Sequence, residues 1–265
     1  MAVEPHHTTS PARRYSRQPA IVSPRTGIGV GIAGLALGML MGIFGHELEP
    51  SSTGELAVLQ WFEDHRTGFL TAVVHVLELV GGPKVVPWVL LGMMTLLMVL
   101  KRIAMSVASV AMPALGWLPG HFAKGWFPRE RPPESLEPVV VYNDVASFPS
   151  GHTGFAASIT IFVLFALTMY GLRRWWMVVL GVVVILIVAL SRLYAAAHFP
   201  MDVVGGALMA GGTSLALCPP AAWFWRKSQA RNDWLAEPAN RAARDGQPHP
   251  AVESSTHADP RTDRL

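Results

Sequence analysis

Two residues near the C-terminal third of the chain, His198 and Asp202, are spaced for nucleophilic chemistry. They lie four positions apart across Pro200, a residue suited to the first turn of a helix. The Asp202 carboxylate could therefore accept a hydrogen bond from one imidazole nitrogen of His198. The other nitrogen would then face a substrate, and a neutral imidazole held in this way is a competent nucleophile. The pair predicts a covalent step on His198.

Three basic residues stand at the ends of apolar stretches, where they can meet His198 on one face of a membrane. They are Lys124, Arg131 and Arg192. Arginine offers planar, bidentate contacts to a phosphate and lysine offers a point charge, so together they could neutralise much of the charge of a phosphoryl group. This set predicts a phosphate-binding cradle.

The run Ser150-Gly151-His152 opens another apolar stretch. A helix that begins there would present a hydroxyl, unpaired N–H groups and its positive dipole end to an anion, which adds donors to the cradle. His152 supplies a second imidazole, which can protonate a departing oxygen near neutral pH. We therefore expect His152 to act as the general acid.

These residues occur in three ordered motifs, and the motifs resemble those of a known family. The motifs are Lys124 with Arg131 and Pro132, then Pro149 to His152, then Ser191 and Arg192 with His198 and Asp202. They are similar to the K-x6-R-P, P-S-G-H and S-R-x5-H-x3-D patterns of the type 2 phosphatidic acid phosphatases. That superfamily shares its active site with the vanadium-dependent haloperoxidases and the microsomal glucose-6-phosphatases. The resemblance covers roughly residues 85–225.

The resemblance implies a role for each matching residue. It implies that His198 forms a phosphohistidine, that Asp202 supports it and that His152 is the general acid. The phosphate would be bound by Lys124, Arg131, Ser150, Gly151 and Arg192, with no metal or other cofactor required. The tails and the segment 69–81 lie outside the match, and the resemblance implies nothing about them.

Each motif by itself also has a structural interpretation. Ser-Gly-His could be an ordinary helix cap, and His198 with Asp202 an ordinary hydrogen-bonded pair. Their conjunction with three cations on one face favours the catalytic interpretation. Other polar residues are expected to be structural. Arg129 and Glu130 are predicted to form a solvated loop pair, residues 63–66 a hydrated outer loop, His121 an interface residue, and His75 with Glu78 a paired polar patch.

The composition indicates a membrane protein. Of the 265 residues, 51% are hydrophobic and 15% are charged, against about 25% charged in a soluble domain. The formal charge of +3 is too small to indicate a nucleic-acid partner. Cys218 is the one cysteine in the sequence, so no intrachain disulfide can form. The ten histidines show no zinc-like spacing, so no metal is indicated.

Charge-poor stretches predict six membrane-spanning helices. They cover 26–45, 85–100, 103–123, 153–172, 175–191 and 203–225, each near the about 20 residues that a helix needs to cross a bilayer. The stretch 103–123 contains two prolines and is counted because an odd number of crossings would put the basic loops on opposite sides. The expected fold is an all-helical, six-span phosphatase domain over 26–225. The polar tails 1–25 and 226–265 are expected to be disordered.

Two further features lie within this domain. The apolar segment 69–81 is too short to cross a bilayer and is predicted to be an interfacial or re-entrant helix. In the first span, Gly34, Gly38 and Gly42 repeat every four residues, which would let another helix approach closely. This span is longer than the about 7–15 apolar residues of a signal peptide, which favours an anchor.

Basic residues that flank the spans predict the orientation. Four groups fall on one side of a six-helix arrangement: Arg13, Arg14, Arg17 and Arg25; Lys101 and Arg102; Arg173 and Arg174; and Arg226, Lys227 and Arg231. This side, with both termini, is expected to be cytoplasmic. Lys124, Arg129, Arg131 and Arg192 fall on the opposite side, where the positive-inside rule would not place them. A phosphate site on the extracytoplasmic face would explain Lys124, Arg131 and Arg192.

The predicted function is hydrolysis of a membrane lipid phosphate or diphosphate. Undecaprenyl diphosphate, phosphatidylglycerol phosphate and phosphatidic acid all present a terminal phosphate to such a site, and the outward-facing site favours the first by analogy. Two alternatives stay open. One is a vanadate-dependent haloperoxidase-like reaction, although those enzymes are soluble. The other is a non-catalytic membrane protein that binds lipid phosphates.

Overall fold

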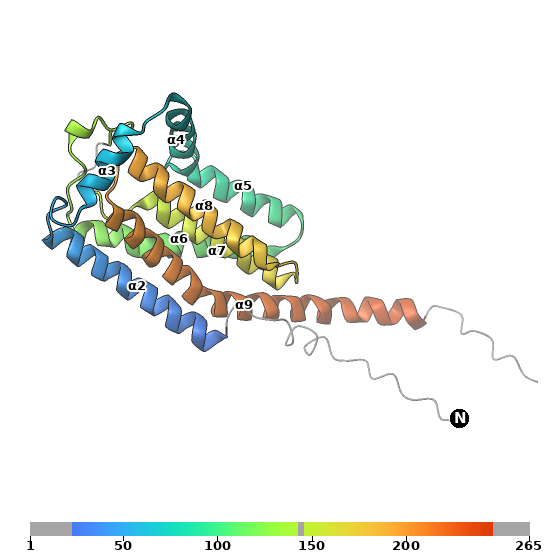
Figure 1. Cartoon of the computed structure of the whole chain (residues 1–265). Coiled ribbons are helices and arrows are strands. Elements are labelled where there is room, and N and C mark those ends of the chain that lie inside the picture. The colour runs from blue at the N-terminus through green and yellow to red at the C-terminus, as the bar shows by residue number, and fades with distance from the viewer. Residues whose placement is uncertain (1–22, 143–145, 246–265) are drawn as a thin grey trace, which may run out of the picture.

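The computed structural model describes residues 23–142 and 146–245, and every regular element in these ranges is a helix (Figure 1). The helices are α2 (Pro24–Glu47), α3 (Glu55–Asp64), α4 (Gly68–Gly81), α5 (Val86–Val99), α6 (Ile103–Trp126), α7 (Gly151–Met169), α8 (Trp175–Tyr194) and α9 (Pro200–Asp245), with a 3₁₀ helix, η1 (Glu134–Leu136), between α6 and α7. The predicted all-helical fold is confirmed. Of the predicted N-terminal tail 1–25, residues 1–22 lie outside the described part of the chain, and Pro24 and Arg25 already belong to α2.

Five of these helices are long and apolar enough to cross a membrane. They are α2, α6, α7, α8 and the first part of α9 (Pro200–Asn232). On α8 the large apolar side chains point away from the bundle, and Leu180 and Leu186 are each more than half exposed. A continuous apolar surface of this kind marks contact with lipid chains, because exposing so much apolar surface to water would be energetically unfavourable. The chain is therefore a multi-pass membrane protein.

A sixth crossing in the described part of the chain requires α4 and α5 together. Each has 14 residues, or about 21 Å, which is shorter than the hydrocarbon core of about 30 Å. The two helices are bent by 60° relative to each other at the break between them. Pro83 and the first-turn Pro87 cannot donate the backbone hydrogen bonds of a continuing helix. The span predicted at 85–100 is thus too short alone, and the segment 69–81 is the bent partner that precedes it.

The glycines of α2 let this helix pack closely against α9. A Cβ atom added to Gly31 would lie 2.6 Å from the carbonyl oxygen of Gly212, and one added to Gly38 would lie 2.3 Å from the side chain of Met209. Any larger side chain at these positions would push the helices apart. The close approach predicted from the four-residue spacing of glycines is confirmed, and the partner helix is α9.

Helix α9 is longer than expected. It continues past Trp225 to Asp245 and has 46 residues, or about 69 Å, which is more than twice the thickness of the hydrocarbon core. The expectation of a disordered tail from position 226 is therefore corrected for residues 226–245. These residues are rich in alanine and arginine, which are strong helix formers, so the segment can be helical without an apolar face. Residues 246–265 lie outside the described part of the chain.

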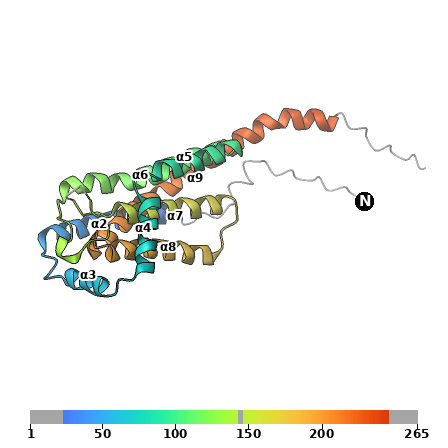
Figure 2. The same ribbon diagram turned by 90° about the horizontal axis from the view of Figure 1, so that it is seen from above.

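The two ends of the bundle differ in charge and in structure (Figures 1 and 2). One end holds the start of α2, the α5–α6 turn, the α7–α8 turn and the far part of α9. These segments carry Arg25, Lys101, Arg102, Arg173, Arg174, Arg226, Lys227 and Arg231. The other end holds α3, η1 and the connections α6–α7 and α8–α9. The described members of the four basic groups thus share one end of the bundle.

Candidate active site

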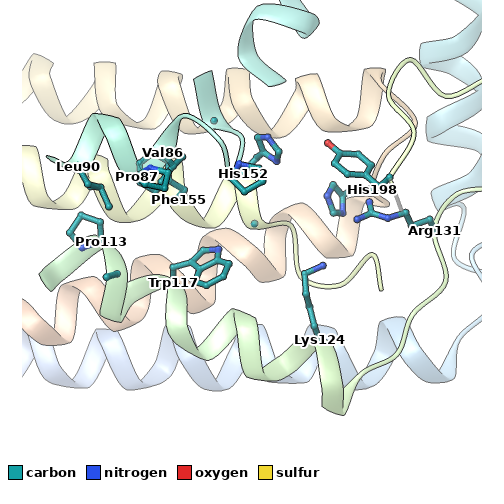
Figure 3. Close-up of a pocket in the computed structure, with 15 residues that line it drawn as sticks. Val86, Pro87, Leu90, Pro113, Trp117, Lys124, Arg131, His152, Phe155 and His198 are labelled. Carbon is teal, nitrogen blue, oxygen red and sulfur yellow. The ribbon is translucent and has the colours of Figure 1, made fainter. Parts of the chain in front are cut away.

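Three segments at the end with α3 and η1 bring the predicted residues together. Lys124 lies in the last turn of α6 and Arg131 in the connection that follows. His152 lies in the first turn of α7, and His198 lies between α8 and α9. Figure 3 shows the side chains of these four residues around one cavity, which they line together. The fold therefore assembles one site from segments that are far apart in the sequence.

His198 and Asp202 face each other in the interior of the site. The His198 Nδ1 atom lies 3.5 Å from Asp202 Oδ2, which is an electrostatic contact and long for a hydrogen bond. Asp202 Oδ2 instead accepts a hydrogen bond of 2.8 Å from the backbone N–H of Phe199. Burial lowers the pKa of His198 despite the opposing effect of Asp202. The imidazole is therefore neutral near pH 7, the form that can attack.

Arg129 holds Asp202 from the side away from His198. Its Nη1 donates a hydrogen bond of 2.8 Å to Asp202 Oδ1, and its Nη2 pairs with Glu55 of α3. Arg129 is 4% exposed, so the predicted solvated pair with Glu130 is wrong. Burial alone would lower the pKa of Arg129, but the two carboxylates raise it overall. The guanidinium is thus a buried charge shared by two acids.

Arg192 is fully buried and does not itself line the cavity, but it contacts Tyr142, which does. Its Nε donates to Ser191 Oγ at 3.2 Å, and its Nη1 donates to Tyr142 Oη at 3.1 Å and pairs with Glu78. Its Nη2 has no hydrogen-bond partner within residues 23–142 and 146–245. Buried donors are nearly always satisfied in native proteins, so the unpaired Nη2 is a donor that a ligand oxygen or a water molecule can satisfy.

Lys124 and Arg131 are held by backbone carbonyl groups. Lys124 Nζ donates to the carbonyl oxygen of Ala146 at 2.7 Å. Arg131 Nη1 donates to the carbonyl oxygen of Ala197 at 2.8 Å, and its guanidinium lies 4.1 Å from the ring centroid of Tyr142. The two cations are therefore positioned before any ligand binds, which is what a cradle for an anion requires.

The first turn of α7 contributes backbone groups to the site. Gly151 and His152 line the cavity, whereas Ser150 is 1% exposed and its hydroxyl accepts a hydrogen bond of 3.2 Å from Thr153. The Ser150 N–H donates to the carbonyl oxygen of Asp202 at 2.9 Å. A Cβ on Gly206 would lie 2.5 Å from the Ser150 carbonyl oxygen, so only glycine allows α9 to pack here. The next N–H groups, at the helix start, are suited to an anion.

His152 contacts a carboxylate that the sequence did not place in the site. Its Nε2 lies 3.5 Å from Glu78 Oε2 and 3.5 Å from the Glu78 carbonyl oxygen. Glu78 also accepts a hydrogen bond of 2.6 Å from Tyr142. The predicted patch of His75 with Glu78 is therefore wrong, because Glu78 turns into the site and His75 is exposed. Ionisable residues inside apolar helices are commonly functional, and this is the signal that could have identified Glu78.

The cavity extends from these polar groups between apolar walls. Its volume is about 480 Å³. The apolar lining comes from α5, α6 and α7 and includes Val86, Pro87, Leu90, Pro113, Trp117 and Phe155. In Figure 3, Leu90 and Pro113 lie at the opposite end of the cavity from His198 and Arg131. The cavity therefore has an ionic end and an apolar end.

Other sequence expectations concern the surroundings of the site. The predicted hydrated loop 63–66 is corrected in part, because Glu63 and Asp64 end helix α3. Arg66 follows this helix and donates to the carbonyl oxygens of Leu136 and Glu137 at 3.0 Å and 2.6 Å. His121 stacks on Trp117, with 5.2 Å between the ring centroids. Within the described ranges, no group of three or more His, Cys, Asp or Glu side chains could hold a metal ion.

Comparison with known proteins identifies the family. The model of the PAP2 superfamily matches residues 86–227, more than half of the chain and a region that includes all three motifs. Curated proteins give no match. A PAP2-type phosphatidylglycerolphosphate phosphatase from Bacillus subtilis has a similar fold, with a TM-score of 0.62 and 18% identity over 72% of this chain and 94% of that chain. LpxE from Aquifex aeolicus has a TM-score of 0.44 and 20% identity over 63% of this chain and 93% of that one. The resemblance to type 2 phosphatidic acid phosphatases is confirmed, and the chain belongs to the PAP2 superfamily.

Proposed function

We propose that this chain removes the terminal phosphate of a membrane lipid phosphate or diphosphate through a phosphohistidine on His198. One observation carries the proposal: the cavity has ionic groups at one end and apolar walls at the other (Figure 3). A phosphate ester on a hydrocarbon chain has the same two parts. The apolar end lies between helices α5, α6 and α7, where a lipid chain could remain in an apolar environment.

In the first step the phosphoryl group binds among Lys124, Arg131 and Arg192, with the N–H groups at the start of α7 as further donors. The neutral imidazole of His198 attacks phosphorus, and a P–N bond forms as the bond from phosphorus to the leaving oxygen breaks. His152 donates its proton to that oxygen. Asp202 stabilises the positive charge that develops on His198, as a carboxylate does in a serine protease triad.

In the second step a water molecule attacks the phosphorus of the phosphohistidine. His152, now neutral, accepts a proton from this water as the P–N bond breaks, and His198 returns to its neutral form. The products are the dephosphorylated lipid and inorganic phosphate. The fixed cations stabilise the charge of the transferring group throughout, so no step requires a metal ion.

Among substrates we prefer undecaprenyl diphosphate. The preference follows from an extracytoplasmic site, which the basic residues at the other end of the bundle support. Phosphatidylglycerol phosphate is the second candidate, since the similar Bacillus subtilis protein is a phosphatidylglycerolphosphate phosphatase, and phosphatidic acid is the third.

The test is phosphate release by purified protein from these three lipids, with glucose 6-phosphate as a soluble comparison. At least one lipid should be hydrolysed, and its kcat/KM should exceed that of the sugar phosphate by about 100-fold or more, since burying several methylene groups stabilises bound substrate. The His198→Ala variant is the inactive control. Activity should persist in EDTA and be inhibited by vanadate, which mimics the transferring phosphoryl group. Preference for the sugar phosphate would refute the proposal.

A further inference from the structure

Glu78 is a carboxylate in the site that the three motifs do not include. It lies on α4, before the first residue of the family match at position 86. Its Oε2 atom pairs with Arg192, accepts the hydrogen bond from Tyr142 and lies 3.5 Å from His152 Nε2. One carboxylate oxygen thus contacts a cation of the phosphate cradle and the expected general acid.

The position of Glu78 is unusual for a phosphate-binding site. A carboxylate near a phosphate repels it, and burying the carboxylate costs free energy unless it is paired. The Glu78 side chain is only 20% exposed, and its pairing with Arg192 compensates for this burial. Glu78 must therefore make a favourable contribution to the reaction that outweighs its repulsion of the phosphate.

The contacts of Arg192 indicate the first contribution. Glu78 and Tyr142 hold the Nη1 group, and Ser191 holds Nε, while Nη2 is the group without a partner in the described chain. A guanidinium is planar and rigid, so fixing two of its nitrogens fixes the direction of the third. Glu78 can therefore stay on Nη1 while a phosphoryl oxygen binds Nη2.

The surroundings of His152 indicate the second contribution. The ionisable groups that face it are Glu78 from α4, Arg192 from α8 and His198 from the α8–α9 connection. Lys124 and Arg131 line the same cavity. Burial of His152 and these cations disfavour a protonated imidazole, yet a general acid must carry a proton. Glu78 is the group facing His152 whose negative charge favours the protonated form.

We propose that Glu78 is a positioning residue of this enzyme, which directs Arg192 toward the phosphoryl group and favours the protonated form of His152 that donates to the leaving oxygen. This inference rests on the proposed function. The close fit of α4 to the site supports it, because a Cβ on Gly81 would lie 2.8 Å from the ring of His152. The absence of a side chain at Gly81 lets the end of α4 bring Glu78 against that imidazole.

The test compares Glu78→Gln with wild type on two substrates over a range of pH. Dioctanoyl phosphatidic acid has a poor leaving group that needs a proton, and p-nitrophenyl phosphate has a good one that does not. For the lipid, kcat at pH 7.5 should fall about 10-fold or more, and the alkaline limb of the kcat profile should move toward lower pH by about one unit. For p-nitrophenyl phosphate, which needs Arg192 but no proton from His152, kcat should fall by no more than about 3-fold, so the larger loss on the lipid reports the effect of Glu78 on His152.

The control variant is Asp64→Asn, which removes an exposed carboxylate at the same end of the bundle and should match wild type. If Glu78→Gln does not fold, Glu78→Asp carries the test. Its shorter side chain draws the charge away from His152, so the alkaline limb should move in the same direction by a smaller amount.

An unmoved alkaline limb, or equal losses on the two substrates, would overturn the role of Glu78. That result is distinct from failure of the proposed function, in which wild-type protein itself would release no phosphate from any lipid.

Discussion

Arg129 donates a hydrogen bond of 2.8 Å to Asp202 Oδ1, the oxygen that does not face His198. The same guanidinium pairs with Glu55, so a helix outside the three motifs is linked to the carboxylate behind the nucleophile. This arrangement leaves Asp202 Oδ2 directed at the imidazole. Arg129 is thus expected to matter for both stability and rate.

Arg129→Gln should be strongly destabilising, because it leaves two buried carboxylates without their cation. Removal of one partner of a buried ion pair costs about 3–5 kcal/mol. Thermal unfolding in detergent should show this loss, and phosphate release should fall in parallel. The control is Arg173→Gln, which removes an exposed arginine at the opposite end. Equal melting temperatures for the two variants would show that the Arg129 pairs contribute little.

The pKa of His198 should determine the acid limb of the activity profile. Burial lowers this pKa below its ordinary value of 6.5, and the neutral form is the nucleophile, so kcat/KM should rise with pH through a midpoint below 6.5. Asp202→Asn removes the charge that favours the imidazolium, so the midpoint should move further toward acid and the plateau should fall about 10-fold or more. Wild type and Asp202→Asn are compared on the same substrate, so the ionisation of the substrate phosphate affects both pH profiles equally. A shift of the midpoint toward alkali in Asp202→Asn would contradict this assignment.

The two histidines should be separable by their leaving-group dependence. His198→Ala should abolish both turnover and any acid-labile phosphoenzyme, because the nucleophile is lost. His152→Ala should lose about 100-fold or more on a lipid phosphate and much less on p-nitrophenyl phosphate, whose leaving group needs no proton. The measurements are kcat on both substrates and trapping of the labelled phosphoenzyme by alkaline denaturation, because a phosphohistidine is stable in alkali and is lost in acid. Equal losses for His152→Ala on the two substrates would exclude the general-acid role.

The apolar end of the cavity should control lipid binding. Ala114 lines it, so Ala114→Phe should fill part of the space and raise KM for a lipid phosphate by about 10-fold. The KM for p-nitrophenyl phosphate should stay unchanged, because that substrate needs only the ionic end. Leu118→Phe is the matched control, since Leu118 lies on the same helix, is exposed and does not line the cavity. Parallel changes for both substrates in Ala114→Phe would argue against a chain-binding role.

The site should face the outside of the cell. Ser135→Cys, at an exposed position in η1, should react with an impermeant maleimide in intact spheroplasts. Leu172→Cys, at an exposed position in the α7–α8 turn, should react only after lysis. The buried native Cys218 should stay unlabelled in both. The opposite pattern would invert the topology and remove undecaprenyl diphosphate recycling at the outer leaflet as the preferred role.

The sequence by itself determined the fold class and predicted the main residues of the candidate site. Apolar stretches of span length predicted the helices, because a bilayer admits only elements that satisfy their own backbone hydrogen bonds. Lys124, Arg131, His152 and His198 were predicted from residue type and fixed local spacing, and the structure places all four on one cavity. Local spacing suffices for such motifs because each covers a short run of the chain, the longest being Ser191 to Asp202.

Tertiary structure decided which distant charges meet. Glu78 appeared to belong with His75 on its own helix, and Arg129 with Glu130 in a loop, because sequence proximity was the available guide. The 60° bend between α4 and α5 and the packing of α3 against α8 and α9 instead bring Glu78 to Arg192 and Glu55 to Arg129. A charge inside an apolar environment must find a partner of opposite sign, but spacing along the chain does not say which one. The relative placement of the helices makes that choice.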